Sequence, residues 1–216
     1  RKLPVRVQVV PQGAVAQLPA HFGVSFEANG RLIQDFAVTG ETRLSVPPGQ
    51  HRVIVSRGYE WELSEQTVDV AAGKTVEVTA SLAHSVDTTG VMCADFHIHS
   101  HYSADSSDEP DQKVRSAIAD GLEIPVSSEH EWILDFQPII TRLGLTRWAF
   151  GMPSEEFTTF VWGHFGVVPI KPRPDEVNNG AVPWVGKKPP EVFANIARLP
   201  EQPVKSRAGD RRQGQQ

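Results

Sequence analysis

The most informative stretch of the chain reads Asp95-Phe96-His97-Ile98-His99-Ser100-His101 and sets three imidazoles two residues apart. Side chains two residues apart on a β-strand point to the same face, so we expect His97 and His99 to project together. Neutral imidazole is the commonest protein ligand for transition-metal ions. The mostly apolar residues 91–98 predict a buried strand that ends in a ligand-rich tip. The alternative is a solvated histidine cluster without a ligand.

Size and charge limit the classes of protein to which the chain can belong. Its 216 residues allow one large domain or two small ones, and an apolar fraction of 39% predicts a globular core. The net charge of −5 and the lack of a Lys/Arg run argue against a nucleic-acid partner. No apolar stretch reaches the about 18 residues of a transmembrane helix. The single cysteine, Cys93, excludes an internal disulfide.

Residues 1–87 are typical of an all-β module. Alternation of apolar and polar residues predicts strands at 5–10, 52–56, 67–70 and 75–80. Turn-forming residues at 29–30, 47–49 and 71–74 separate these segments, and helical periodicity is absent. Short strands at this spacing predict a small antiparallel β-sandwich.

One hairpin of this module resembles a known family. Residues 44–53 contain Pro47-Pro48-Gly49 followed by an alternating strand, and they resemble a hairpin of carboxypeptidase-regulatory-like modules. His51 lies beside this turn, where we expect a surface side chain without a metal role.

The pattern changes after the polar turn at 87–90, where we place the domain boundary. Strands are expected at 91–98, 122–126, 147–151 and 166–170, and helices from Pro110 to the C-cap Gly121, at 138–143 and at 190–199. This strand–helix–strand order predicts parallel strands with right-handed crossovers. Ligands gather at the carboxyl ends of such strands, where we expect His99, His130 and the loop around Glu156.

Imidazole and carboxylate side chains occur in four clusters along the chain. They are His97 with His99, Asp105 with Asp108, Glu129-His130-Glu131, and Glu155-Glu156 followed by His164. Histidines supply affinity for Zn, Fe or Mn, and a carboxylate can bridge two ions. The clusters therefore predict a multinuclear metal centre that activates water near neutral pH.

The order of the clusters resembles the PHP family (polymerase and histidinol phosphatase), and most closely its CehA/McbA-like metallohydrolases. The matching motifs are Asp95-Phe96-His97-Ile98-His99-Ser100 with Ser103 and Asp105, Ala119-Asp120-Gly121-Leu122-Glu123 leading to Ser128-Glu129-His130, Glu156 with Thr158-Thr159, and Gly163-His164-Phe165. The preceding regulatory-like module also matches this subgroup. The resemblance covers most of residues 40–200.

The resemblance implies a role for six residues, namely His97, His99, Asp105, His130, Glu156 and His164. The first two would bind one ion, Glu156 would bridge two ions, and His164 would bind the second. Asp105 and His130 would bind or position a third ion. The cofactors would be two or three divalent ions of Zn, Mn or Fe. His130 and His164 would be catalytic, orienting reacting groups where they are not both ligands.

The residues leave alternatives open for several of these roles. Asp108 could replace Asp105, which would then cap the loop or the helix behind it. Glu155 could replace Glu156, because only one of two adjacent strand residues faces inward.

The histidines and tryptophans also have structural alternatives. His130 could be a hydrogen-bonded residue at a strand end, and His164 a packed residue at a strand start. For His101 a solvated loop position is favoured over ligation. Core or pocket-wall positions are favoured for Trp132, Trp148 and Trp162.

The chain carries only part of what the PHP resemblance implies. Such proteins continue after the helix matching 190–199 into a strand with an Asn-His-Pro motif and later an Asp-x-His motif, and neither occurs here. A closed α/β barrel also takes about 200 residues or more. The expected fold is therefore a β-sandwich at 1–87, an incomplete PHP-type distorted α/β barrel at 88–204 and a disordered polar tail at 205–216.

The first and last residues of the chain each lead to a further expectation. Because the chain begins at Arg1 rather than methionine, we expect the natural N-terminus, with any signal peptide, to lie upstream. Truncation of a working enzyme, through a frameshift after Val204, would account for the polar tail.

These observations favour a metal-dependent hydrolase of the PHP type. It would act, as a truncated fragment, with metal-activated water on phosphoester or carbamate- and ester-like bonds of an unidentified small molecule. The alternative is a non-catalytic exported module, whose β-sandwich binds a partner and whose second half is a degenerate relic. The resemblance alone favours a periplasmic or secreted location, and the sequence identifies no oligomeric state.

Overall fold

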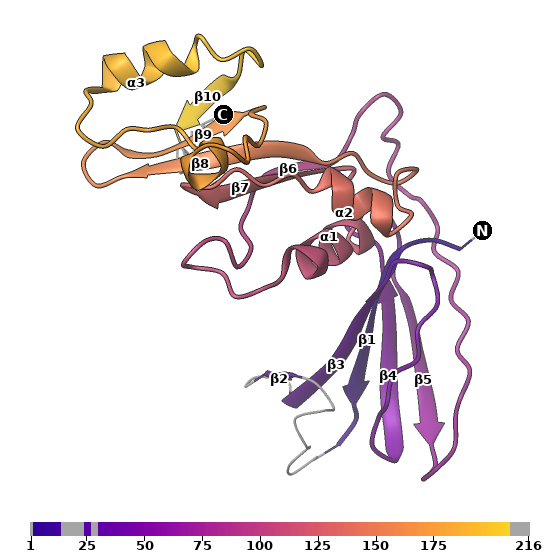
Figure 1. The fold of residues 1–216 in the computed structure, drawn as a ribbon. Helices are drawn as coiled ribbons and strands as arrows, with labels where there is room; N and C mark the ends of the chain where they lie inside the picture. The colour runs from indigo at the N-terminus through magenta and orange to yellow at the C-terminus, as the bar shows by residue number, and fades with distance from the viewer. Residues whose placement is uncertain (1, 14–23, 27–29, 208–216) are drawn as a thin grey trace, which may run out of the picture. The chain divides into compact units, whose positions relative to one another are not determined.

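The computed structural model describes residues 2–13, 24–26 and 30–207, and the chain divides into two compact units. The first comprises Arg1–Met92 and Arg115–Leu122, and the second comprises Cys93–Val114 and Glu123–Gln216. Each unit has a five-stranded sheet, with strand order β2-β3-β1-β4-β5 in the first and β10-β9-β8-β7-β6 in the second (Figure 1). The protein is therefore rich in β-structure.

Every strand pair of the first sheet is antiparallel. Its strands are β1 (Val5–Pro11), β2 (Val24–Phe26), β3 (Gly30–Ala37), β4 (Gly49–Ser56) and β5 (Ser64–Val70). The expected strands at 5–10, 52–56 and 67–70 lie within β1, β4 and β5. The sequence predicts neither β2 nor β3, because consecutive apolar residues such as Leu32 and Ile33 hide the alternation.

One face of this sheet carries the core of the first unit. The buried residues are Val5, Val9, Ile33, Ala37, Val53 and Val55. Leu44, Val78 and Leu82, which lie outside the strands, pack against them. The expected strand at 75–80 is not formed, and the described residues of this unit contain one sheet rather than the two of a sandwich. Val78 and Ala80 of this segment pack against the core, whereas Val76 is exposed, and such packing requires no hydrogen-bonded ladder.

His51 is buried, and the expectation of a surface position is wrong. Its side chain is 1% exposed, and Nε2 lies 2.7 Å from the carbonyl oxygen of Pro47. His51 shares a face of β4 with Val53 and Val55, because residues two apart on a strand point the same way. Strand parity, rather than the neighbouring turn, decides its burial.

The second sheet has a parallel half and an antiparallel half. The elements of this part of the chain are β6 (Ala94–Ile98), α1 (Pro110–Ala119), β7 (Ile124–His130), α2 (Gln137–Arg142), β8 (Met152–Thr159), β9 (Gly163–Val168), the 3-10 helix η2 (Val177–Gly180), α3 (Pro189–Ile196) and β10 (Val204–Arg207). Strands β6, β7 and β8 are parallel, as the strand–helix–strand order predicts, whereas β9 is antiparallel to β8 and β10. The sheet is curled, as half of a barrel would be (Figure 1).

Several expected strands of this unit differ from the structure. The expectation of a buried strand at 91–98 is wrong, since β6 begins only at Ala94 and Phe96 is 55% exposed, because β6 is the edge strand of its sheet. The strand expected at 122–126 runs instead from Ile124 to His130. Residues 147–151 form no strand, because a hydrogen bond from Trp148 N to Leu145 O at 2.8 Å folds the segment into a turn. The strand expected at 166–170 begins earlier, at Gly163, and pairs with β8 as an antiparallel hairpin. Only three residues separate the two strands, too few for a parallel crossover.

The polar segment after Val204 is ordered further than the sequence predicts. The expectation of disorder from residue 205 is wrong as far as Arg207, where β10 ends, and residues 208–216 lie outside the described residues. Val204 is 68% exposed, which shows that this strand needs no buried face. A strand at the edge of a sheet needs only one backbone partner, here β9, so polar residues can continue it.

Apolar residues of β8, β9, α3 and the connecting segments form the core of the second unit. Its buried members are Ile133, Phe157, Val167, Ile170, Val182, Val192 and Ile196. Val114 and Ile118 lie one turn apart on α1 and are both 0% exposed, so this side of the helix is buried. Gly121 follows this helix with φ +90°, in the left-handed conformation typical of a helix C-cap.

Candidate metal centre

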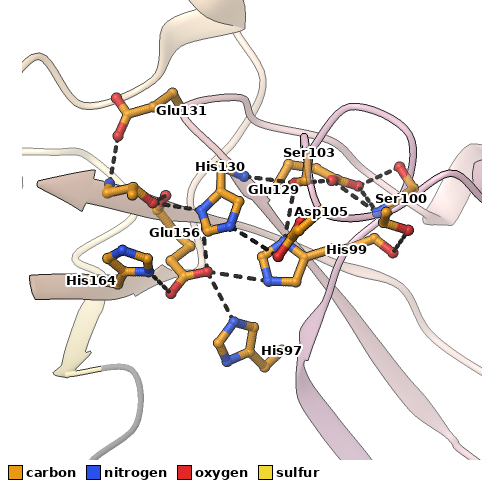
Figure 2. A network of polar contacts seen from close by, with 12 residues as sticks. His97, His99, Ser100, Ser103, Asp105, Glu129, His130, Glu131, Glu156 and His164 are labelled. Carbon is orange, nitrogen blue, oxygen red and sulfur yellow. Dashed lines mark hydrogen bonds and ion pairs between the residues drawn. The ribbon is translucent and has the colours of Figure 1, made fainter.

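Four histidines and a glutamate converge on one side of the curled sheet (Figure 2). His97 and His99 come from the end of β6, His130 from the end of β7, Glu156 from β8 and His164 from β9. The register pairs His130 with Glu156 on parallel strands and His164 with Thr158 on antiparallel strands. Strand pairing thus brings together side chains that are far apart in sequence.

The first histidine pair projects together, as its spacing predicts. The ring centroids of His97 and His99 are 4.8 Å apart. Strand β6 ends at Ile98, one residue before His99, and its register with β7 shifts between Asp95 and Ile98. An irregular strand end, rather than a continuous strand, therefore brings the two rings together.

The carboxylate of Glu156 lies among the four imidazoles. Its side chain is 2% exposed, and Oε2 lies 2.9 Å from His97 Nε2 and 3.2 Å from His99 Nε2. Oε2 is also 3.4 Å from His130 Nδ1, whereas Oε1 lies 3.1 Å from His164 Nδ1. The two oxygens therefore face different histidines, as in a carboxylate that bridges two metal ions.

Three overlapping groups of side chains could each hold a metal ion. They are His97, His99 and Glu156; His99, Asp105 and His130; and His130, Glu156 and His164. Within each group the candidate ligand atoms lie within 4.8 Å of one another. A set of imidazole nitrogens and carboxylate oxygens suits Zn, Mn or Fe. The donor set therefore fits the divalent ions that the resemblance implies, and it contains all six residues predicted as ligands.

The structure also separates the two acidic alternatives near His99. Asp105 Oδ2 lies 3.4 Å from His130 Nε2. Asp108 Oδ2 instead lies 2.9 Å from Lys113 Nζ, outside the three groups. Asp105 is therefore the aspartate that joins the histidines.

His101 and the three tryptophans occupy other positions. His101 lies outside the three groups, and its Nδ1 is 2.9 Å from Glu109 Oε2. Trp132 stacks on Tyr102 with ring centroids 5.4 Å apart, and Trp162 packs against the core of the second unit. The ring of Trp148 lies 4.9 Å below the guanidinium of Arg147.

The electrostatics of the cluster favour a negative charge on Glu156. Burial raises the pKa of this carboxyl, but hydrogen bonds to His99 and His97 and the charges of His97 and His130 outweigh burial and lower the pKa to about 2. The hydrogen bond to Glu156 raises the pKa of His99 in turn. Desolvation likewise raises the pKa of Asp105, and the nearby charges of His99 and His130 lower it overall. The centre therefore presents carboxylates to a cation.

Glu155 occupies the opposite face of β8. Its side chain is 0% exposed, and its carboxyl oxygens accept the N–H of Val182 at 3.0 and 2.9 Å. Burial raises the pKa of Glu155 to about 8. The open choice between the two adjacent glutamates is therefore decided, since Glu156 alone faces the histidines.

The buried carboxylate of Glu129 supports two of the histidines. Glu129 belongs to one of the four clusters in the sequence, where no role was predicted for it. It is 0% exposed and accepts hydrogen bonds from Ser100 N at 2.9 Å, Ser100 Oγ at 2.5 Å and Ser103 Oγ at 2.6 Å. Ser103 Oγ lies 3.1 Å from His99 Nδ1 and accepts the backbone N–H of His130 at 2.9 Å (Figure 2). The sequence signal for the contact between Ser103 and His99 is the position of this serine, four residues after a candidate ligand.

A second support reaches His130 through Thr158. Thr158 Oγ1 lies 2.5 Å from His130 Nδ1, and the backbone N–H of Thr158 donates to Glu131 at 2.5 Å. Glu131 also accepts the indole N–H of Trp184 at 2.9 Å, and its φ of 54° is in the left-handed region. No local pattern predicts the role of Trp184, because it lies 53 residues from its partner.

Comparison of the chain with protein-family models, with curated proteins and with solved structures finds no match. Within the described part of the chain, no helix has the length and apolar character needed to cross a membrane. The function is therefore argued from the geometry of the site.

Proposed function

We propose that the protein is a metal-dependent hydrolase of the PHP type, acting on phosphoester or carbamate- and ester-like bonds. The observation that carries the proposal is the buried Glu156 carboxylate, whose two oxygens face four imidazoles from three strands or strand ends. Buried carboxylates are normally paired with a cation or with hydrogen-bond donors, and metal ions combine readily with this donor set. The order of motifs along the chain supports the PHP assignment.

The residues would divide between two or three ions. His97, His99 and Glu156 would hold the first, and Glu156, His130 and His164 the second. Asp105 with His130 would hold or position a third ion as an alternative to the use of His130 on the second, because a neutral imidazole offers one nitrogen to one ion. Such ions supply a hydroxide near neutral pH and stabilise negative charge on a carbonyl or phosphoryl oxygen.

The side chains themselves define where a substrate would approach. The His97 and His164 side chains are 46% and 45% exposed, whereas Glu156 between them is 2% exposed. Substrate would therefore reach the cluster from the side of these two histidines. His130 is 22% exposed and is held by Thr158, so His164 has more freedom to orient a reacting group.

The test is the metal content of the purified full chain, measured by elemental mass spectrometry. We expect stoichiometric Zn, Mn or Fe, with a large decrease in His97→Ala. His101→Ala is the matched control, because this histidine lies in the same segment but outside the three groups.

Hydrolysis assays then separate the bond classes. Reconstituted protein is given aryl phosphoesters, aryl carbamates and carboxylic esters, and His97→Ala should lose turnover that His101→Ala retains. Protein without bound metal, or with equal metal content in both variants, would contradict the proposal and favour a non-catalytic module.

A further inference from the structure

The connection between β8 and β9 exposes two large apolar side chains. Phe160 and Val161 are 94% and 86% exposed, although burial would stabilise each of them. Trp162, the last residue before β9, is half-buried and packs against the core of the second unit. Apolar residues scattered singly over a surface need no explanation, whereas contiguous ones mark contacts with a membrane, a protein or a ligand.

A second turn lies against the first and exposes another apolar residue. A hydrogen bond of 3.0 Å from Lys187 N to Trp184 O closes this turn, and Val185 within it is 77% exposed. The rings of Trp184 and Phe160 join the two turns, with centroids 5.7 Å apart in an edge-to-face contact. The indole N–H of Trp184 donates to Glu131 at 2.9 Å, which anchors the pair of turns beside the end of β7. We refer to residues 160–162 and 184–188 together as the aromatic tip.

The shape of the aromatic tip argues against a binding pocket for a small molecule. Such pockets are concave and bury most of the surface of their ligand. Phe160 and Val161 instead stand almost fully in solvent, so neither side chain encloses a ligand. Projecting apolar side chains of this kind suit a partner into which they can insert.

The basic residues of the aromatic tip favour a membrane over a protein partner. Lys187 and Lys188 follow the second turn, and the side chain of Lys188 is exposed. From Phe160 to Arg207 the chain has seven basic and four acidic residues, although the whole chain has a net charge of −5. Lysine is depleted at protein–protein interfaces. Tryptophan is enriched where a protein meets the membrane–water interface, and neighbouring lysines are attracted to anionic lipids.

We propose that the aromatic tip inserts reversibly into the headgroup region of an anionic lipid bilayer. Phe160, Val161 and Val185 would contact the acyl boundary, and Lys187 and Lys188 would lie near lipid phosphates. Such attachment places a protein on a membrane surface and requires no segment that spans the bilayer. It also requires no metal ion, so the inference goes beyond the proposed hydrolase activity and does not depend on it.

The test is flotation of the purified full chain with vesicles. One preparation contains equal parts of phosphatidylcholine and phosphatidylglycerol, and the other contains phosphatidylcholine alone. We expect stronger binding to the anionic vesicles, which weakens as salt is raised. Phe160→Ser should lower the partition coefficient about 10-fold, because the burial of one phenylalanine side chain is lost. Lys187→Gln and Lys188→Gln should each lower it about 5-fold on anionic vesicles and leave it unchanged on neutral ones.

Two exposed residues of the first unit supply matched controls. Tyr59 is a fully exposed aromatic residue outside the aromatic tip, and Lys74 is an exposed lysine in a turn. Tyr59→Ser and Lys74→Gln should bind vesicles like the wild type. His97→Ala should also bind vesicles like the wild type, so a failure of the proposed metal centre is distinguishable from a failure of this inference.

Wild-type protein that does not float with anionic vesicles would overturn the inference, and so would equal flotation of Phe160→Ser. Equal binding of the wild type to neutral and anionic vesicles would also overturn it. A wild-type dimer that Phe160→Ser dissociates, measured by analytical ultracentrifugation, would assign the aromatic tip to contact between two copies instead. The comparison of the two vesicle types uses wild-type protein alone, so the test remains decisive if a variant does not fold.

Discussion

The two faces of β8 place adjacent carboxyl groups in opposite environments. Glu155 shares its face with Phe157 in the apolar core, where its polar contact is the N–H of Val182. Glu156 shares its face with Thr158 and is met by four imidazoles. The pKa is raised to about 8 on one face and lowered to about 2 on the other. Both side chains are nearly inaccessible to solvent, and desolvation raises the pKa of Glu155, whereas at Glu156 the histidine partners outweigh desolvation.

The largest expected difference between the two faces is in metal binding. Glu156→Gln removes a ligand shared by two of the candidate groups, and we expect affinity for Zn²⁺ to fall by more than about 100-fold, beyond the range for supporting residues. Glu155→Gln preserves shape on the opposite face and should bind metal like the wild type. Zn²⁺ titration of both variants measures the contrast, and equal losses would mean that the faces are not independent.

The second largest expected effect is a pH dependence of the free energy of unfolding that is caused by Glu155. Its pKa is about 8 in the folded protein against 4.5 normally, so the folded state retains a proton that the unfolded state has lost. Stability should fall as pH rises through this window, by up to about 1.4 kcal/mol per pH unit. Chemical denaturation of metal-free protein at several pH values should show a shallower slope for Glu155→Gln. A wild-type slope in the variant would assign this dependence to other groups.

Glu156 should give a smaller pH dependence of stability, with the opposite sign. Its folded pKa of about 2 lies below the ordinary 4.5, so its contribution is present above pH 4.5 and is lost as pH falls toward 2. Metal-free Glu156→Gln should therefore be less stable than wild type near neutral pH, and the difference should shrink in acid. Paired denaturation curves measure it, and a deficit that persists at the lowest pH would show lost packing instead of lost charge interaction.

The smallest effect is expected far from both faces and sets the background for these comparisons. Arg142 Nη2 contacts Asp111 Oδ1 and Oδ2 at 2.8 and 2.7 Å, with side chains 59% and 44% exposed. An exposed ion pair contributes about 0–1 kcal/mol, and salt screens it. Arg142→Ala should therefore change the free energy of unfolding by less than about 1 kcal/mol. A larger loss by thermal or chemical denaturation would indicate packing by the arginine stem.

Local patterns in the sequence predicted much of the second unit. The spacing of His97 and His99 predicted neighbouring rings, and the strand–helix–strand order predicted the parallel part of the sheet. The parallel order follows from the connections between strands, which short-range sequence determines. The neighbouring rings were predicted from a continuous strand, whereas an irregular end of β6 brings them together, with His99 beyond the strand. The six candidate ligands came from the resemblance in motif order, and the structure gathers them within three overlapping groups.

Only the tertiary structure decided which face each residue occupies and what it meets there. Parity requires Glu155 and Glu156 to point opposite ways, but it does not say which face carries the histidines. Likewise, strand parity buried His51 beside a turn, and backbone pairing with β9 ordered the polar residues of β10. The supporting contacts of Glu129 and Glu131 join segments that are 26 to 53 residues apart. Such contacts depend on how the chain folds back on itself, and no local periodicity encodes them.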